Sequence, residues 1–204
     1  MPKNDTDIIK RILEGETKAF ALLIDRHKAM GMTLALRMLK NRQDAEEALQ
    51  DAFLRAFKAL DRFERKSAFS TWFFRILYNV CSSQLKLRKE PQNISLSNND
   101  DEPPVQLQSD EPLPDIDFET LEFRNIVCEE IEKLDAMYAG VLTLFLLQDL
   151  GYDEIVEVTG LPLGTVKTRL SRARLQLRER VLKRYEGRRI QRRKNEILFE
   201  EIRL

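Results

Sequence analysis

Histidine and cysteine are scarce in this chain: its 204 residues include one histidine, His27, and two cysteines, Cys81 and Cys128. Neither cysteine belongs to a CxxC pair or has a histidine nearby in the sequence, so a metal site or a catalytic thiol is not predicted. A glycine-rich phosphate loop, a nucleophile elbow and paired carboxylates in an apolar setting are also missing. We therefore predict a protein that is not an enzyme and needs no cofactor, with both cysteines as ordinary buried thiols.

Long apolar runs are missing as well. No stretch approaches the roughly 20 apolar residues that a membrane-spanning helix needs. The first residues, MPKNDTDIIKRILEGE, mix acidic with apolar side chains and have no small-residue cleavage site, which argues against a signal peptide. These absences predict a cytoplasmic protein with no membrane insertion.

Glycine and proline are few, at seven each, while 43% of the residues are hydrophobic and 33% are charged. This balance is typical of a mostly helical protein. We predict an all-α fold of two small helical domains joined by a flexible acidic linker. The predicted boundaries are 1–90 for the first domain, 91–118 for the linker, 119–187 for the second domain and 188–204 for a tail.

The linker is predicted from a change in composition. It contains five of the seven prolines together with many acids, and it has little ability to bury apolar surface. The residues that define it are Pro91, Asp100, Asp101, Glu102, Pro103, Pro104, Asp110, Glu111, Pro112, Pro114, Asp115 and Asp117.

Four helices are expected in the first domain. Asp5 or Thr6 can cap the first helix. Asp44 followed by Glu47 is a variant of the capping box and predicts the start of the third helix. The four helices should cover about residues 5–13, 17–40, 44–60 and 69–86.

A helix-turn-helix is predicted in the stretch GYDEIVEVTGLPLGTVKTRLSRARLQLRER, residues 151–180. A short helix over 153–158 is followed by a turn at 159–162, and a longer helix begins near Gly164. In such a motif the second helix lies in the major groove of DNA. Its buried stripe is expected to consist of Val166, Leu170, Ala173, Leu177 and Val181.

The other face of this second helix is cationic. Between Lys167 and Lys194 there are thirteen lysines or arginines against two glutamates, a net charge of +11 in a chain whose formal charge is zero. This asymmetry indicates a polyanionic partner, although most charge runs are simply solvated. The residues expected to contact DNA are Thr165, Lys167, Thr168, Arg169, Ser171 and Arg172.

Aromatic residues crowd into the predicted fourth helix, with lysines and arginines among and around them. Rings beside cations suit single-stranded nucleic acid, because unstacked bases need ring faces and phosphates need positive charge. The same rings also fit the buried stripe of a helix, and we expect most of them to be core. They are Phe69, Trp72, Phe73, Phe74 and Tyr78.

In combination, three blocks make the chain resemble a bacterial RNA polymerase sigma factor of the extracytoplasmic-function (ECF) class, in the sigma-70 family. They are DAEEALQDAFLRAFKALDRF, the Phe69 to Trp72 pairing followed by RILYN, and DEIVEVTGLPLGTVKTRLSRARLQLRERV. The resemblance implies a factor that binds core RNA polymerase through both large subunits and starts transcription at two-part promoters. It also implies an anti-sigma factor as a partner.

The resemblance assigns roles to individual positions. The helix from Asp44 to Leu60 would dock on the polymerase clamp through Glu47, Gln50, Asp51 and Arg55. The helix from Leu134 to Leu147 would meet the flap of the other large subunit. The −10 element would be opened and read by the loop at 61–67 and the helix that follows. In that region Phe63 and Ser83 would line a pocket for an extruded base, and Trp72 would also contact the −10 DNA. Lys66, Arg75, Lys86 and Arg88 would hold phosphates. The −35 element would be read by the residues named above at the start of the last helix.

Two other functions remain open. A stand-alone helix-turn-helix regulator would bind its operator without polymerase, usually as a dimer. A sigma-like decoy for an anti-sigma factor would have little need of the cationic groups at 167–172.

Because two weak contacts act together only on a shared partner, a sigma factor of zero net charge should bind DNA poorly until polymerase positions both domains.

Overall fold

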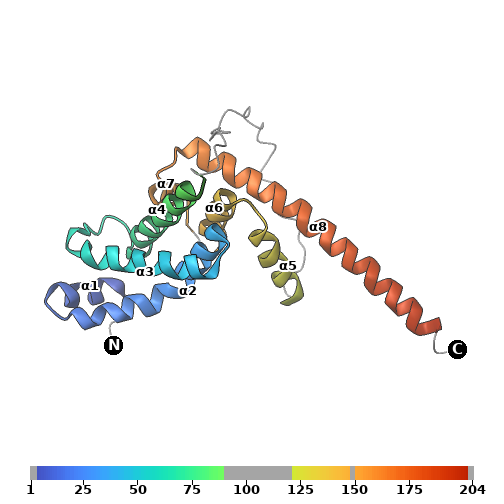
Figure 1. Cartoon of the computed structure of the whole chain (residues 1–204), viewed down its shortest axis with the longest axis horizontal. Coiled ribbons are helices and arrows are strands. Elements are labelled where there is room, and N and C mark those ends of the chain that lie inside the picture. The colour runs from blue at the N-terminus through green and yellow to red at the C-terminus, as the bar shows by residue number, and fades with distance from the viewer. Residues whose placement is uncertain (1–3, 90–120, 148–149, 202–204) are drawn as a thin grey trace.

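A computed structural model of the chain describes residues 4–89, 121–147 and 150–201. Within these ranges the secondary structure consists of eight α-helices and two short 3-10 helices, without strands (Figure 1). The predicted all-α fold is confirmed. None of the helices in the described ranges is both long and apolar enough to cross a membrane.

The first half contains four α-helices, as predicted, but two of their starts were predicted wrongly. The first helix is capped by Asn4, whose side chain accepts from the Asp7 N–H at 3.0 Å, and not by Asp5 or Thr6. The third is capped by Asn41, which accepts from the Asp44 N–H at 3.1 Å, so Asp44 lies inside the first turn. An asparagine amide satisfies these free N–H groups as well as a carboxylate does. The elements are α1 (Asp5–Leu13), η1 (Thr17–Ala19), α2 (Phe20–Leu39), α3 (Arg42–Lys58), η2 (Leu60–Arg62) and α4 (Phe69–Lys89).

Stacked aromatic rings hold α3 and α4 together. The Phe73 ring lies 4.3 Å from that of Phe53 and 6.2 Å from that of Phe69, nearly parallel to both. Close approach of α2 completes this core, because a β-carbon at Gly31 would come within 2.7 Å of the Leu49 side chain. The first half is therefore organised around a fully buried Phe73.

The second half consists of α5 (Leu121–Glu132), α6 (Ala136–Leu147), α7 (Tyr152–Thr159) and α8 (Leu163–Glu201). The helix expected from Leu134 to Leu147 is observed as α6, which begins two residues later, and residues 148 and 149 lie outside the described ranges. The final helix continues through Gly187 for 39 residues, about 58 Å. Its C-terminal part extends well away from the other helices in Figure 1.

The two halves are in direct contact, α2 with α6 and α4 with α7. Arg37, which is buried in α2, donates to the hydroxyl of Thr143 at 3.2 Å. Packing is close beside it, since a β-carbon at Gly140 would lie 3.3 Å from Cγ of Met38 and 3.4 Å from Cε2 of Tyr78. The predicted linker, residues 91–118, lies outside the described ranges, and the halves on either side of it share an interface.

The cysteine prediction is correct for one residue only. Cys81 is buried in α4, and burial raises the pKa of its thiol to about 12. Cys128 is exposed. The buried stripe of α5 runs through Ile126, Glu130 and Ile131, so Cys128 falls on a different side of the helix.

A buried carboxylate joins α5 to α8. Glu130 accepts from Lys133 at 2.6 Å and from Arg184 at 2.8 Å. Burial alone would raise the pKa of Glu130, but the hydrogen bonds and charges of Lys133 and Arg184 outweigh it and hold the pKa below its ordinary value. Sequence reasoning missed this cluster because Arg184 is 54 residues from Glu130.

Glu130→Gln should destabilise the protein by about 1 kcal/mol at pH 7, a modest cost because the Lys133 and Arg184 head groups reach solvent. A carboxylate with a lowered pKa stabilises the fold above its ordinary value of 4.5, and this contribution is lost as the pH falls. The difference in free energy of unfolding between wild type and variant, measured by urea denaturation, should therefore disappear at acidic pH. The control is Glu129→Gln, which removes an exposed partner of the same Arg184. An equal loss in that control would contradict the role of burial.

Candidate nucleic-acid interface

The helix-turn-helix has the predicted geometry. At the end of α7, Gly160 adopts a left-handed conformation with φ of 68°, which glycine adopts more readily than other residues. The chain then turns at Leu161, and the Val166 N–H donates to the Pro162 carbonyl at 3.0 Å as α8 begins. At the start of α7 the Glu154 carboxylate accepts from the Gly151 N–H at 3.0 Å.

The predicted stripe of α8 is buried. All five of its residues are nearly inaccessible, and they are Val166, Leu170, Ala173, Leu177 and Val181. On the other faces Lys167 is exposed, while Thr165, Thr168, Ser171 and Arg172 are half-buried. The Thr168 hydroxyl donates to the Gly164 carbonyl at 2.9 Å within the helix.

Arg169 has a different environment from the other predicted DNA-reading residues. Its guanidinium lies beside the hydroxyl of Tyr78 in α4, and its Nη1 atom is buried. Burial raises the pKa of Tyr78, and the positive charge of Arg169 acts in the opposite direction. The start of the recognition helix therefore touches the helix predicted to read the −10 element.

The aromatic rings of α4 are mostly core, as expected. Phe69, Phe73, Phe74 and Tyr78 are buried. Trp72 is only half-buried, and its ring lies 5.0 Å from that of Phe63 and 5.8 Å from that of Phe69. Trp72 and Phe63 therefore present aromatic surface at the edge of the core, beside the loop that precedes α4.

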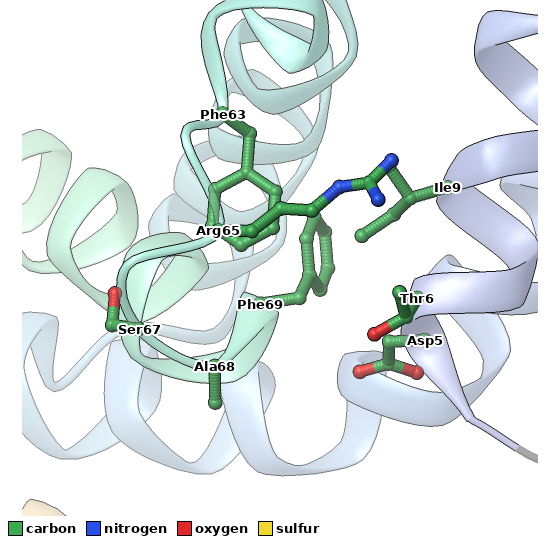
Figure 2. Close-up of a pocket in the computed structure, with 8 residues that line it drawn as sticks. All are labelled: Asp5, Thr6, Ile9, Phe63, Arg65, Ser67, Ala68 and Phe69. Atoms are coloured by element: carbon green, nitrogen blue, oxygen red, sulfur yellow. The ribbon is translucent and has the colours of Figure 1, made fainter.

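A pocket of about 90 Å³ lies between this loop and the start of α1 (Figure 2). The rings of Phe63 and Phe69 form apolar surface in it, and Arg65, Asp5 and Thr6 supply polar groups. Ser83 lies on α4 fourteen residues after Phe69, about 21 Å along the helix, and is exposed. The structure thus places Phe63 at a pocket and Ser83 away from it. The contribution of α1 was not expected from the sequence, because α1 and the loop are some 60 residues apart.

The basic residues predicted to hold phosphates differ in their contacts. Arg75 and Lys86 are exposed on α4. Lys66 pairs with Glu64 at 2.5 Å, in a loop where both side chains remain largely in solvent. Arg88 forms an ion pair with Asp44 and donates to the Leu39 carbonyl at 3.3 Å, so it also ties α4 to the turn between α2 and α3.

The polar face of α3 is accessible. Glu47, Gln50 and Arg55 are exposed, Asp51 is half-buried, and Arg55 pairs with Asp51 at 2.8 Å. Leu54 shares this face, four residues after Gln50, and its surface is 51% exposed. This exposed leucine was not singled out from the sequence, although its position outside the apolar stripe was a usable signal.

The described residues contain no group of three or more His, Cys, Asp or Glu that could hold a metal ion. The candidate surfaces described above are cationic, aromatic or mixed polar. They can bind phosphates, stack on bases and form a protein interface.

Each half of the chain matches the model of a known protein family. Residues 23–90 match the model of sigma-70 region 2, and residues 125–177 match that of sigma-70 region 4. These matches define the class of protein as a sigma-70 factor.

Curated relatives narrow the class. The chain is 34% identical over 176 residues to the ECF RNA polymerase sigma factor SigW of Bacillus subtilis, covering 85% of this chain and 94% of the relative. It is 33% identical over 176 residues to the ECF RNA polymerase sigma-E factor of Escherichia coli K12, covering 83% and 90%. The chain belongs to the ECF family of RNA polymerase sigma factors.

Solved structures share the fold. One is the sigma factor RpoE in complex with the anti-sigma factor NepR from Bartonella quintana, with 23% identity and a TM-score of 0.58 over 81% of this chain and 98% of that one. Another is CnrH in complex with the cytosolic domain of CnrY, with 23% identity and a TM-score of 0.55 over 85% and 94%.

Trp72→Ala should lower the free energy of unfolding by about 2 kcal/mol, because a half-buried ring loses fewer contacts than the ~3–5 kcal/mol typical of a fully buried one. The matched control is Phe73→Ala, at a fully buried ring on the same helix. Urea denaturation followed by circular dichroism measures both. Equal losses would place Trp72 in the core and leave it no surface for DNA.

Proposed function

We propose that this sigma factor binds core RNA polymerase and directs it to two-part promoters through the surfaces described above. The observation that carries the proposal is the juxtaposition of a cationic recognition helix in one half with a half-exposed aromatic edge in the other. A duplex element needs a helix that enters its major groove, and a melted element needs ring faces for its bases. Both requirements are met within one chain. The proposed boundaries of the two units stay at 1–90 and 119–187, with the linker at 91–118 and the tail at 188–204.

The clamp of polymerase is the proposed partner of α3. Glu47, Gln50, Asp51 and Arg55 supply a polar rim, and exposed Leu54 supplies an apolar centre. Interfaces commonly combine an apolar anchor with a polar surround that excludes water. The same architecture gives α6 the proposed role of meeting the flap of the other large subunit.

The −10 element is the proposed ligand of the loop before α4 and of α4 itself. The pocket at Phe63 offers ring surface and polar groups to an extruded base, and Trp72 extends this surface. Arg75 and Lys86 supply exposed positive charge for phosphates, to which Lys66 and Arg88 can add. Ser83 remains a proposed contact of the strand further along α4, outside the pocket.

The −35 element is the proposed ligand of the first turns of α8. Phosphate contacts position the helix, and a few side chains choose the sequence. Thr165, Lys167, Thr168, Ser171 and Arg172 are the candidates with accessible surface in the present arrangement. Arg169 becomes available only when α4 and α8 separate. We also propose that the protein acts in the cytoplasm with polymerase, and that an anti-sigma factor regulates it.

Reconstitution with purified core polymerase tests the function. The protein should co-migrate with core in gel filtration, and the mixture should start transcripts at defined positions on genomic DNA. Sequencing those transcripts would reveal the promoter motif. Specific, tight DNA binding by the protein alone, without any effect on core, would instead favour a stand-alone regulator.

Two variants should separate the two kinds of contact. Leu54→Ser should weaken core binding by about tenfold or more, because it removes the apolar anchor. Lys167→Ala should leave core binding intact and reduce transcription only from promoters with a −35 element, by about tenfold. Leu13→Ser is the control for the first variant, since Leu13 is a similarly exposed leucine on α1. If Lys167→Ala also lost core binding, the start of α8 would have a structural role and no reading role.

A further inference from the structure

Two hydroxyl groups at the start of α4 donate hydrogen bonds to carboxylates of α7. The Ser67 hydroxyl, in the loop before α4, donates to Glu157 at 2.8 Å. The Thr71 hydroxyl, in the first turn of α4, donates to Glu154 at 3.4 Å and is completely buried in this arrangement. One short helix thus places two acids on two neighbouring hydroxyls.

A carboxylate and a DNA phosphate present the same chemistry to a hydroxyl donor. Both are anionic, and both accept hydrogen bonds through paired oxygens. Ser67 lines the Phe63 pocket, and Thr71 directly precedes Trp72 in α4, in the region where the proposed function puts the melted strand. Hydroxyl side chains are common phosphate contacts in protein–DNA complexes.

We infer that Glu154 and Glu157 of α7 stand in for phosphates of the −10 strand, and that Ser67 and Thr71 bind those phosphates when α7 leaves. This inference rests on the proposed function and deepens its −10 site. The first helix of the helix-turn-helix therefore competes with single-stranded DNA for the same two donors.

Other contacts between the two halves also cover surfaces that are proposed to bind DNA. Arg169, a predicted reader of the −35 element, lies against Tyr78 of α4 while the halves are in contact. Close packing of Gly140 on Met38 and Tyr78 brings α6 onto the same side of the first half. The contact therefore covers part of the −10 surface and part of the −35 surface together, and opening it releases both.

The hydroxyl–carboxylate contacts are suited to being exchanged. Each joins a neutral donor to a charged acceptor and carries only part of the strength of a buried ion pair. A nucleic-acid strand offers many phosphates along its length, so it can replace two carboxylates once polymerase holds it nearby.

The test is the affinity of the full-length protein for single-stranded DNA of mixed sequence, about 20 nucleotides long and labelled with fluorescein. Mixed sequence is suitable because phosphate contacts do not depend on the bases. Glu154→Gln with Glu157→Gln should raise the affinity about tenfold, since the amides compete less well for the hydroxyls. The Glu154→Gln change keeps a side-chain oxygen that can accept from the Gly151 N–H, so α7 retains its cap.

The matched control removes the same total charge elsewhere in the second half. Asp153→Asn with Glu179→Gln changes two exposed acids, one on α7 and one on α8. An equal gain in this control would mean that bulk charge alone matters and would overturn the inference. Adding Ser67→Ala to the Glu154→Gln, Glu157→Gln protein should reverse part of the gain, and no reversal would rule out Ser67 as a phosphate contact.

Core polymerase separates this inference from the proposed function. If wild type and the Glu154→Gln, Glu157→Gln protein both bind core and start transcripts, but their affinities for single-stranded DNA are equal, the inference alone fails. If neither binds core or starts transcripts, the proposed function fails.

Discussion

The stacking of Phe73 between Phe53 and Phe69 fixes α4, and the positions of the other surfaces depend on that helix. The aromatic side of α4 joins the core of the first half, and the start of the helix borders the pocket at Phe63. The hydroxyl groups of Ser67 and Thr71, at the same end, donate to carboxylates of α7. A helix with this many neighbours has little freedom to rotate, because protein cores are close-packed. Residues proposed for recognition are thus held in place by residues that stabilise the core, which agrees with the interleaving of rings and cations along the same segment.

Charge is distributed so that a neutral chain can still bind a polyanion. The strongly cationic run starts inside the recognition helix, while the acids of the linker are separated from it in the sequence. Acids are also present where the halves meet, at Glu154 and Glu157, and there each accepts a hydrogen bond from a hydroxyl group. In the proposed function the local placement of charge, more than net charge, would control access to DNA, because exposed charges beyond about 10 Å are screened at ordinary salt.

Periodicity was sufficient to predict the helices and the buried stripe of α8, since both depend on near neighbours in the chain. The stripe from Val166 to Val181 is buried as predicted. The prediction of helix starts was wrong where Asn4 and Asn41 are the caps, because several polar residues in a row can serve as caps and the sequence does not rank them. Contacts between distant segments could not be predicted at all: Glu130 with Arg184, Ser67 with Glu157, and α1 with the loop at Phe63 all require the packed arrangement. The role of Cys128 was misjudged because apolar neighbours in sequence do not specify which side of a helix faces inward.

The length of α8 has a mechanical consequence. Its first turns carry the residues that would enter a DNA groove, and the same unbroken helix continues for 39 residues. A straight rod of about 58 Å converts a tilt of about 10° at one end into a displacement of about 10 Å at the other. The far end of the rod would therefore act as a pointer whose position reports how the recognition turns are seated, and any molecule that grips that end would gain leverage over them.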